Sequence, residues 1–143
     1  MRYLADTNIL LRSSEPAHSD TVTATQLLLR RGDTLHVIAQ NLIEFWNVAT
    51  RPTGGNGLGM TISETQAELV HIKDLLSLLL DTPAIYPKWE RLVVQHAVKG
   101  KNVHDTRIVA AMNIHRISHL LTFNGPDFRR FPGITILSPS DVE

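Results

Sequence analysis

The sequence contains no cysteine, which excludes a disulfide framework and any metal site built on thiolates. It also has no net charge, because 14 Lys and Arg residues balance 14 Asp and Glu residues. No overall electric field therefore draws the protein onto nucleic acid or an anionic membrane. This balance argues against a tight nucleic-acid binder, but it does not exclude an enzyme that binds RNA briefly.

Long apolar runs are missing as well. The longest run, residues 75–80, is interrupted by Ser77 and is far shorter than the roughly 20 residues of a membrane-spanning helix. The first residues lack a basic start followed by a long apolar core, so we expect no signal peptide. The resulting expectation is a cytoplasmic protein that crosses no membrane.

The residues that are present fit one globular domain spanning 1–143, with 43% hydrophobic and 20% charged residues. Short apolar runs predict strands at 3–5, 35–39, 82–86, 118–123 and 134–137. Helical spacing of apolar residues predicts helices at 19–31, 42–50, 63–80, 88–98 and 104–115. Strands that alternate with helices pair in parallel, so we predict an α/β three-layer sandwich with helices on both faces of the sheet.

Acidic residues recur where predicted strands end. Asp6 directly follows the first strand, Glu44 lies in the first turn of the helix after the second, and Asp105 lies in the first turn of the helix before the fourth. Asn124 and Asp127 follow the fourth strand. The carboxyl ends of parallel strands meet at one edge of the sheet, where ligands bind if the strand order reverses. We therefore expect these side chains to converge.

Each acidic residue, taken singly, also fits a capping role. Asp6 is placed to cap the turn that follows it, and Asn41 and Glu44 fit a capping box with Glu44 reaching back. The helix dipole favours Asp105 in a first turn by about 0.3–1 kcal/mol, and Asp127 is placed to begin a short turn. Capping and metal binding are compatible, so both interpretations stay open for each residue.

The acidic residues as a set are harder to explain by capping. Several carboxylates within a few ångströms of one another repel, so at neutral pH one of them takes up a proton or the group binds a cation. Oxygen ligands without His or Cys favour Mg²⁺ or Mn²⁺ over zinc. Such an ion suits phosphoryl chemistry, because it activates water and stabilises charge on a phosphate.

Four segments together resemble the PIN-domain family, especially the small toxins of the VapC type: "LADTNIL", the Glu44 helix, "HDTRIVAAM" and "LLTFNGPDFRRF…GITIL". The resemblance covers nearly the whole chain in order and spacing. It implies a five-stranded parallel sheet of order 3-2-1-4-5 and a Mg²⁺-dependent endoribonuclease that cleaves single-stranded RNA. Mn²⁺ is a possible substitute for Mg²⁺. The family also implies a homodimer, with contacts in the helices after the second strand, and a small antitoxin partner encoded alongside.

The resemblance assigns a metal site residue by residue. Asp6, Glu44 and Asp105 match the first three acids of the family. Many relatives place the fourth acid two residues after the threonine that ends the fourth strand, where this chain has Asn124, and the next acid is Asp127. We therefore predict metal ligation by all five residues and catalysis by the four acids.

Supporting roles fall to three residues beside the acids, Thr7, Asn8 and Thr122. A threonine hydroxyl there either orients a ligand carboxylate, contacts a phosphate, or caps its own turn.

Basic residues gather late in the chain, and four of them are candidate RNA contacts: Lys101, Arg107, Arg129 and Arg130. Arg107 is alternatively close enough in sequence to Asp105 to pair with a carboxylate of the site. The arginines at 129 and 130 are alternatively solvated surface charge.

Two other functions remain open at this stage. A catalytically weak PIN-like module that binds RNA or protein is compatible with the uncharged Asn124. A phosphoacceptor signalling domain also places acids at strand ends, but it needs a lysine late in the chain after a strand, and no lysine follows the fourth predicted strand.

Overall fold

The computed structural model describes residues 1–15 and 19–142, although the side chains of Ser19 and Asp20 are outside this description. The strands are β1 (Arg2–Ala5), β2 (Thr34–Ile38), β3 (Ser77–Leu79), β4 (His119–Leu121) and β5 (Thr135–Leu137). The α-helices are α1 (Thr7–Ser13), α2 (Ser19–Arg30), α3 (Ala39–Thr50), α4 (Ile62–Leu75), α5 (Ile85–Gln95) and α6 (Asn102–His115).

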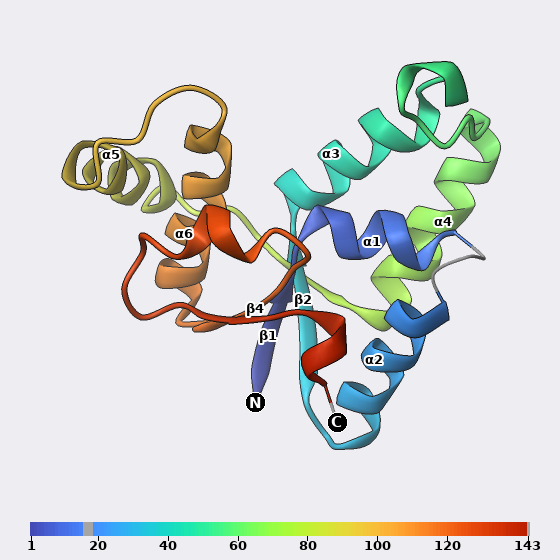
Figure 1. Cartoon of the computed structure of the whole chain (residues 1–143), viewed down its shortest axis with the longest axis horizontal. Coiled ribbons are helices and arrows are strands. Elements are labelled where there is room, and N and C mark those ends of the chain that lie inside the picture. The colour runs from blue at the N-terminus through green and yellow to red at the C-terminus, as the bar shows by residue number, and fades with distance from the viewer. Residues whose placement is uncertain (16–18, 143) are drawn as a thin grey trace.

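The strands form one parallel sheet in the order β3-β2-β1-β4-β5, which confirms the predicted topology. The chain adds β2 and β3 on one side of β1 and then returns to place β4 on the other side. The strand order therefore reverses between β1 and β4. Figure 1 shows α5 and α6 on one face of the sheet and α1 to α4 on the other, so the structure is the expected three-layer sandwich.

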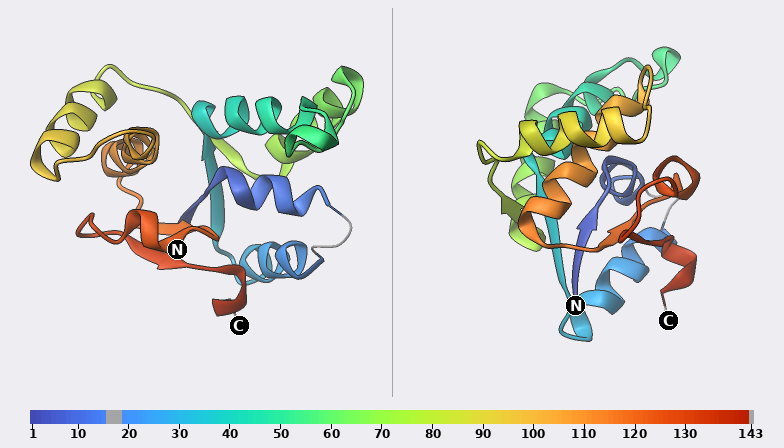
Figure 2. Two further views of the ribbon diagram at one scale, coloured as in Figure 1. Left: turned by 45° about the horizontal axis from the view of Figure 1, so that its top comes forward. Right: turned by 90° about the vertical axis from the view of Figure 1, so that its left-hand side faces the viewer.

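The central strand β1 supplies both hydrophobic cores, because its successive side chains point to opposite faces. Leu4 packs with Leu120 in the core under α5 and α6. Tyr3 and Ala5 pack with Phe45 in the core under α1 to α4. Burial on both faces explains why β1 reads as a continuous apolar run. The two further views in Figure 2 show α5 running close beside α6, against which it packs.

The third strand was wrongly placed by the sequence pattern. Residues 82–86 are not a strand: β3 is Ser77–Leu79, and α5 begins at Ile85. The leucine run that we read as the end of a helix instead forms an edge strand, so Leu78 and Leu80 stay 39% and 71% exposed. Pro87 lies in the first turn of α5, where a backbone N–H has no helical partner, so a proline is tolerated there.

The helix α4 begins at Ile62, one residue before the predicted start at 63. The Thr61 hydroxyl accepts a hydrogen bond from the Glu64 N–H (3.1 Å), and the Glu64 carboxylate accepts one from the Thr61 N–H (2.9 Å). This reciprocal pair is a capping box, which fixes the start of the helix. No helix among residues 1–15 and 19–142 is long and apolar enough to cross a bilayer.

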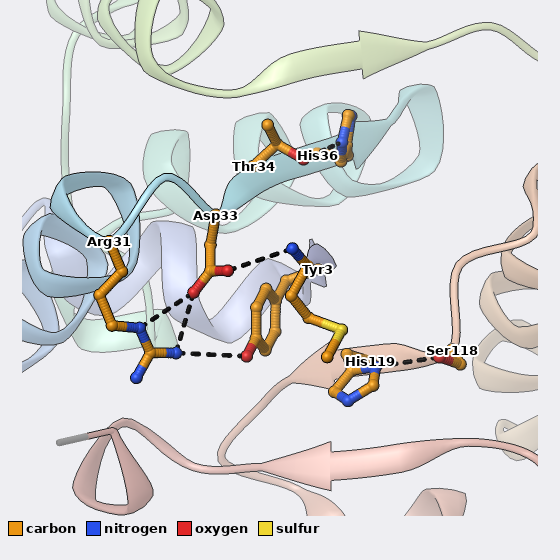
Figure 3. A network of polar contacts seen from close by, with 8 residues as sticks. Tyr3, Arg31, Asp33, Thr34, His36, Ser118 and His119 are labelled. Carbon is orange, nitrogen blue, oxygen red and sulfur yellow. Dashed lines mark hydrogen bonds and ion pairs between the residues drawn. The ribbon is translucent and has the colours of Figure 1, made fainter.

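A polar network closes the amino end of the sheet, opposite the acidic residues (Figure 3). Arg31 donates to Asp33 (2.9 Å), whose other oxygen pairs with the amino group of Met1 (3.2 Å). The Arg31 guanidinium holds the pKa of the Asp33 carboxyl below its usual range. The Tyr3 ring meets the His119 ring edge-on, with 5.3 Å between centroids. These contacts fix the start of β1 against its neighbours and leave the other edge for the site.

The glycine-rich loop after α3 gives a test of the fold. A Cβ on Gly57 would overlap the backbone carbonyl of Arg51, whereas a Cβ on Gly54 meets nothing within 4 Å. We expect Gly57→Ala to destabilise the protein by about 1–3 kcal/mol, as forced overpacking does. Gly54→Ala should leave stability unchanged or slightly raised. Urea unfolding of both variants measures the difference, and equal midpoints would contradict the loop geometry.

Candidate metal and nuclease site

The site is centred on Asp6, at the point where β1 and β4 end side by side. The Asp6 backbone N–H donates to the carbonyl of Leu121 (2.9 Å), the last residue of β4. The side chain is only 6% exposed, and one carboxylate oxygen accepts from the Thr7 N–H (2.8 Å). Asp6 is thus the N-cap of α1, as the sequence predicted.

The other oxygen of Asp6 accepts from the Thr122 hydroxyl (2.8 Å) and more weakly from the Asn8 amide (3.4 Å). The Thr122 hydroxyl oxygen in turn accepts from the backbone N–H of Asn124 (3.0 Å). The Asn8 side-chain oxygen accepts from the N–H of Phe123 (3.2 Å). This network ties the end of β4 to α1 through one buried carboxylate. The two predicted supporting residues Asn8 and Thr122 therefore both contact Asp6.

Glu44 reaches the same edge from the second turn of α3. One of its carboxylate oxygens accepts from the Thr7 hydroxyl (2.8 Å), and the other accepts from the Gln40 amide (3.0 Å). The expected capping box with Glu44 is wrong, because the residue that reaches back to the Ile38 N–H is Asn41 (3.0 Å). Because Asn41 caps α3, the Glu44 carboxylate does not serve as a cap and lies at the site instead.

Two of the four acids, Asp6 and Asp105, have raised pKa values. Burial first, and then the nearby charges of Asp6, Asp127 and Glu44, together raise the pKa of Asp105 to about 6. Burial also raises the pKa of Asp6, against the lowering effect of the hydrogen bonds from Thr122 and Thr7, and Glu44 and Asp127 raise it further. Glu44 and Asp127 therefore lie close enough to Asp6 and Asp105 to act on both, although the four carboxylates come from four separate parts of the chain.

No positive charge is paired with these acids in the described residues. Within 1–15 and 19–142, none of the ion pairs reaches them, and Arg107 pairs with Asp81 (3.3 Å) rather than with Asp105. In the same residues, no three His, Asp or Glu side chains stand close enough together to enclose an ion as they are placed. The carboxylates lie near one another without converging on a common point, as expected of like charges that share no cation.

The donor set fits a hard divalent cation. Its side chains offer carboxylate oxygens. Burial first, and repulsion by the neighbouring carboxylates second, raise the pKa values of Asp6 and Asp105, and a bound cation would offset both. Asp127 belongs to this set by its effect on both pKa values. Asn124 is exposed, and its backbone N–H contacts Thr122. Whether its amide oxygen ligates an ion stays a prediction.

The four basic residues predicted to contact RNA divide into two groups. Lys101, Arg129 and Arg130 are exposed. Arg107 is partly buried and donates to Gln40 (3.2 Å) as well as pairing with Asp81. RNA contact by these residues stays a prediction.

Sequence reasoning missed Gln40 and Asp81 and gave Asn41 only a capping role. Gln40 lies four residues before Glu44 on the same helix face, a spacing that allows direct contact and was therefore a usable signal. Asn41 is fully buried and also donates to the Thr7 hydroxyl (3.3 Å). Nothing local in the sequence marks Asp81, since its partner lies far along the chain.

The sheet order and the acidic edge define a PIN-like α/β sandwich. A chain of the Rickettsia felis VapBC2 complex, bound there to a DNA fragment from its promoter, superposes with a TM-score of 0.75 at 18% identity over 96% of this chain and 98% of that one. A chain of VapBC-1 from nontypeable Haemophilus influenzae gives 0.65 at 17% identity over 98% and 99%.

VapC20 from Mycobacterium tuberculosis, a sarcin-ricin loop cleaving toxin, gives a TM-score of 0.65 at 13% identity over 89% of this chain and 93% of that one. No family model matches the sequence, and neither does any curated protein. The resemblance to PIN-domain toxins of the VapC type is thus confirmed in the fold.

The buried contact between Thr122 and Asp6 gives a test of the site's stability. Thr122→Val keeps the shape of the side chain but removes a donor to Asp6 and an acceptor for the Asn124 N–H. We expect a loss of about 1–3 kcal/mol in the free energy of unfolding, because buried polar groups are left unpaired. Thr135→Val, at an exposed position of β5, should change stability by about 0.5 kcal/mol or less. Similar urea midpoints for both variants would contradict the network.

Asp105 gives a test by pH. Its pKa rises from 3.8 to about 6 on folding, so the folded protein holds the proton more tightly. The stability from this group is present below about pH 4 and is lost as pH rises through about 6. In a metal-free chelating buffer, Asp105→Asn should therefore gain about 1 kcal/mol over the wild type between these pH values, after allowing for solvent screening. Asp74→Asn, on the exposed side of α4, should show no such gain.

Proposed function

We propose that this protein is a Mg²⁺-dependent endoribonuclease that hydrolyses phosphodiester bonds in single-stranded RNA, with Mn²⁺ as a substitute ion. The proposal rests on the grouping of four acids where the strand order reverses in a PIN-like sheet: Glu44 and Asp127 lie close enough to Asp6 and Asp105 for their charges to act on both. Ligand sites of open parallel sheets lie at that point. The similarity in fold to VapC20, a sarcin-ricin loop cleaving toxin, supports the same class of reaction.

Asp6, Glu44 and Asp105 would hold the ion, with Asp127 and Asn124 completing the cluster. When bound, the ion would lower the pKa of a water molecule and neutralise charge on the scissile phosphate. The carboxylate of Glu44 or Asp127 accepts the proton of the attacking water. The hydroxyls of the threonines that contact Asp6 and Glu44 keep those carboxylates in orientation.

The four basic residues named above, Lys101, Arg107, Arg129 and Arg130, would contact the RNA backbone. Exposed Lys and Arg side chains beside an acidic centre attract phosphates without requiring a net positive protein. Repulsion between the acids and the RNA is then reduced by the cation and by these residues together. Binding should weaken as salt concentration rises.

The comparisons with VapBC complexes support a biological role as the toxin of a toxin–antitoxin pair. A homodimer in the cytoplasm is part of the same proposal. On this proposal, expression of the chain arrests growth. Co-expression of a small neighbouring reading frame that encodes the antitoxin restores it.

A second candidate is a PIN-like module that binds RNA or protein without cleaving. Two observations favour it: no three acids in the described part of the chain enclose a common point, and Asn124 carries no charge. Mn²⁺ calorimetry separates the two functions, since a nuclease site binds the ion at millimolar concentration or below. The phosphoacceptor alternative is not supported, because no lysine follows β4.

The decisive experiment measures cleavage of a fluorescent, mixed-sequence single-stranded RNA with Mg²⁺ or Mn²⁺. We expect Asp105→Asn to lower the single-turnover rate about 100-fold or more, because a charged ligand and its influence on the proton acceptor are lost. Asp74→Asn should cleave like the wild type, and excess chelator should stop both. Cleavage by Asp105→Asn at the wild-type rate, or in chelator, would overturn the proposal.

A further inference from the structure

Gln40 spans the two helices that carry the acids. Its side-chain N–H groups donate to the Glu44 carboxylate (3.0 Å) in α3 and to the backbone carbonyl of His104 (2.8 Å) in α6, next to Asp105. Its side-chain oxygen accepts from Arg107 (3.2 Å). Both N–H groups and the oxygen of the Gln40 side-chain amide are therefore hydrogen bonded.

The orientation of the amide is fixed by these partners. Turning it over would set its oxygen against the Glu44 carboxylate and the His104 carbonyl, which have no proton to donate, and would set its N–H group against Arg107. Only one of the two orientations pairs every donor with an acceptor. Gln40 is therefore held as a rigid link rather than as a free surface side chain.

Arg107 extends this link to a third part of the chain. Its second terminal nitrogen lies 3.3 Å from the Asp81 carboxylate, which follows the edge strand β3. The guanidinium thus holds the oxygen of Gln40 with one nitrogen and Asp81 with another. A planar guanidinium suits this double contact, whereas a lysine ammonium would not reproduce its fixed geometry.

Glu44 has no freedom left to choose its own orientation. Thr7 donates to one of its carboxylate oxygens and Gln40 to the other. The Thr7 contact joins Glu44 to the Asp6 side of the site, and the Gln40 contact joins it to the Asp105 side. Removing Gln40 leaves the first connection intact and breaks the second.

We propose that Gln40, held by Arg107 and Asp81, is a positioning residue that sets Glu44 relative to Asp105 for divalent-cation binding. The inference rests on the proposed function, because it takes these acids as ligands. Partners that orient ligands typically change metal affinity or activity by about 10–100-fold when they are removed. Arg107 acts on cation binding through its contact with Gln40.

The test replaces Gln40 with methionine, which matches its length and lacks its donors. We expect Gln40→Met to weaken Mn²⁺ binding in calorimetry about 10-fold and to lower cleavage of the mixed-sequence RNA at limiting Mn²⁺ by a similar factor. Its affinity for that RNA in chelator should equal that of the wild type. The matched control is Gln66→Met, at an exposed position of α4, which should change none of these values. Unchanged Mn²⁺ affinity in Gln40→Met would overturn the inference.

Arg107→Met, made in the wild type and in Gln40→Met, tests whether Arg107 acts through Gln40. If Arg107 acts through Gln40, the substitution weakens Mn²⁺ binding in the wild type and has little further effect in Gln40→Met, since the two side chains share one network. If the two effects instead multiply, or if Arg107→Met lowers RNA affinity in chelator with Mn²⁺ binding unchanged, the link is refuted.

A measurement without metal separates this inference from the proposed function. Amide exchange by NMR on the wild type should show the Gln40 side-chain N–H₂ protected relative to that of Gln66. If the wild type bound no Mn²⁺, the nuclease proposal would fail, and protection would still support the link between α3 and α6. Exchange as fast as that of Gln66 would overturn the link, whatever the metal affinity and even where Gln40→Met fails to fold.

Discussion

The site is organised around one buried carboxylate, that of Asp6, at the place where β1 and β4 end side by side. A carboxylate in this position is stable only if its oxygens are hydrogen bonded. Thr7 and Thr122 supply those bonds, and in doing so they fix the start of α1 and the end of β4. Thr7 also links Asp6 to a second acid, because its hydroxyl donates to the Glu44 carboxylate of α3. The fold and the acidic edge are therefore products of the same few contacts.

The grouping of four carboxylates at one edge of the sheet lowers the stability of the metal-free fold. The sheet topology brings Asp6, Glu44, Asp105 and Asp127 together, and the charges of Glu44 and Asp127 add to the effect of burial in raising the pKa values of Asp6 and Asp105. Neutral donors reduce the cost at Asp6 but do not cancel it, since the pKa of that group is still raised. A protein that used these acids only as helix caps would gain nothing from such crowding. The electrostatic cost of these buried, crowded carboxylates fits a site whose free energy is lowest with a cation bound.

The sequence was sufficient for the fold where its signals were local and strong. Strand β1, the helices α2 and α6, and the reversal of strand order followed from apolar periodicity and from the PIN-like motifs. It failed at β3, because a leucine run on an edge strand has no alternation that distinguishes it from a helix. It identified the acids but not how they are held: the contacts of Gln40 with His104 and of Arg107 with Asp81 join distant parts of the chain, and no spacing rule encodes them.

The chemical type of the partners explains how such a site can remain open to an ion. Glu44 and Asp6 are held by hydroxyl, amide and backbone N–H groups, which orient a carboxylate without neutralising it. A lysine or arginine in the same place would satisfy the charge and would have to be displaced by any incoming cation. Arg107 contacts Gln40, which itself holds Glu44, yet the guanidinium is paired with Asp81 and not with an acid of the site. The carboxylates of the edge thus keep their negative charge, and a protein of zero net charge presents an acidic centre.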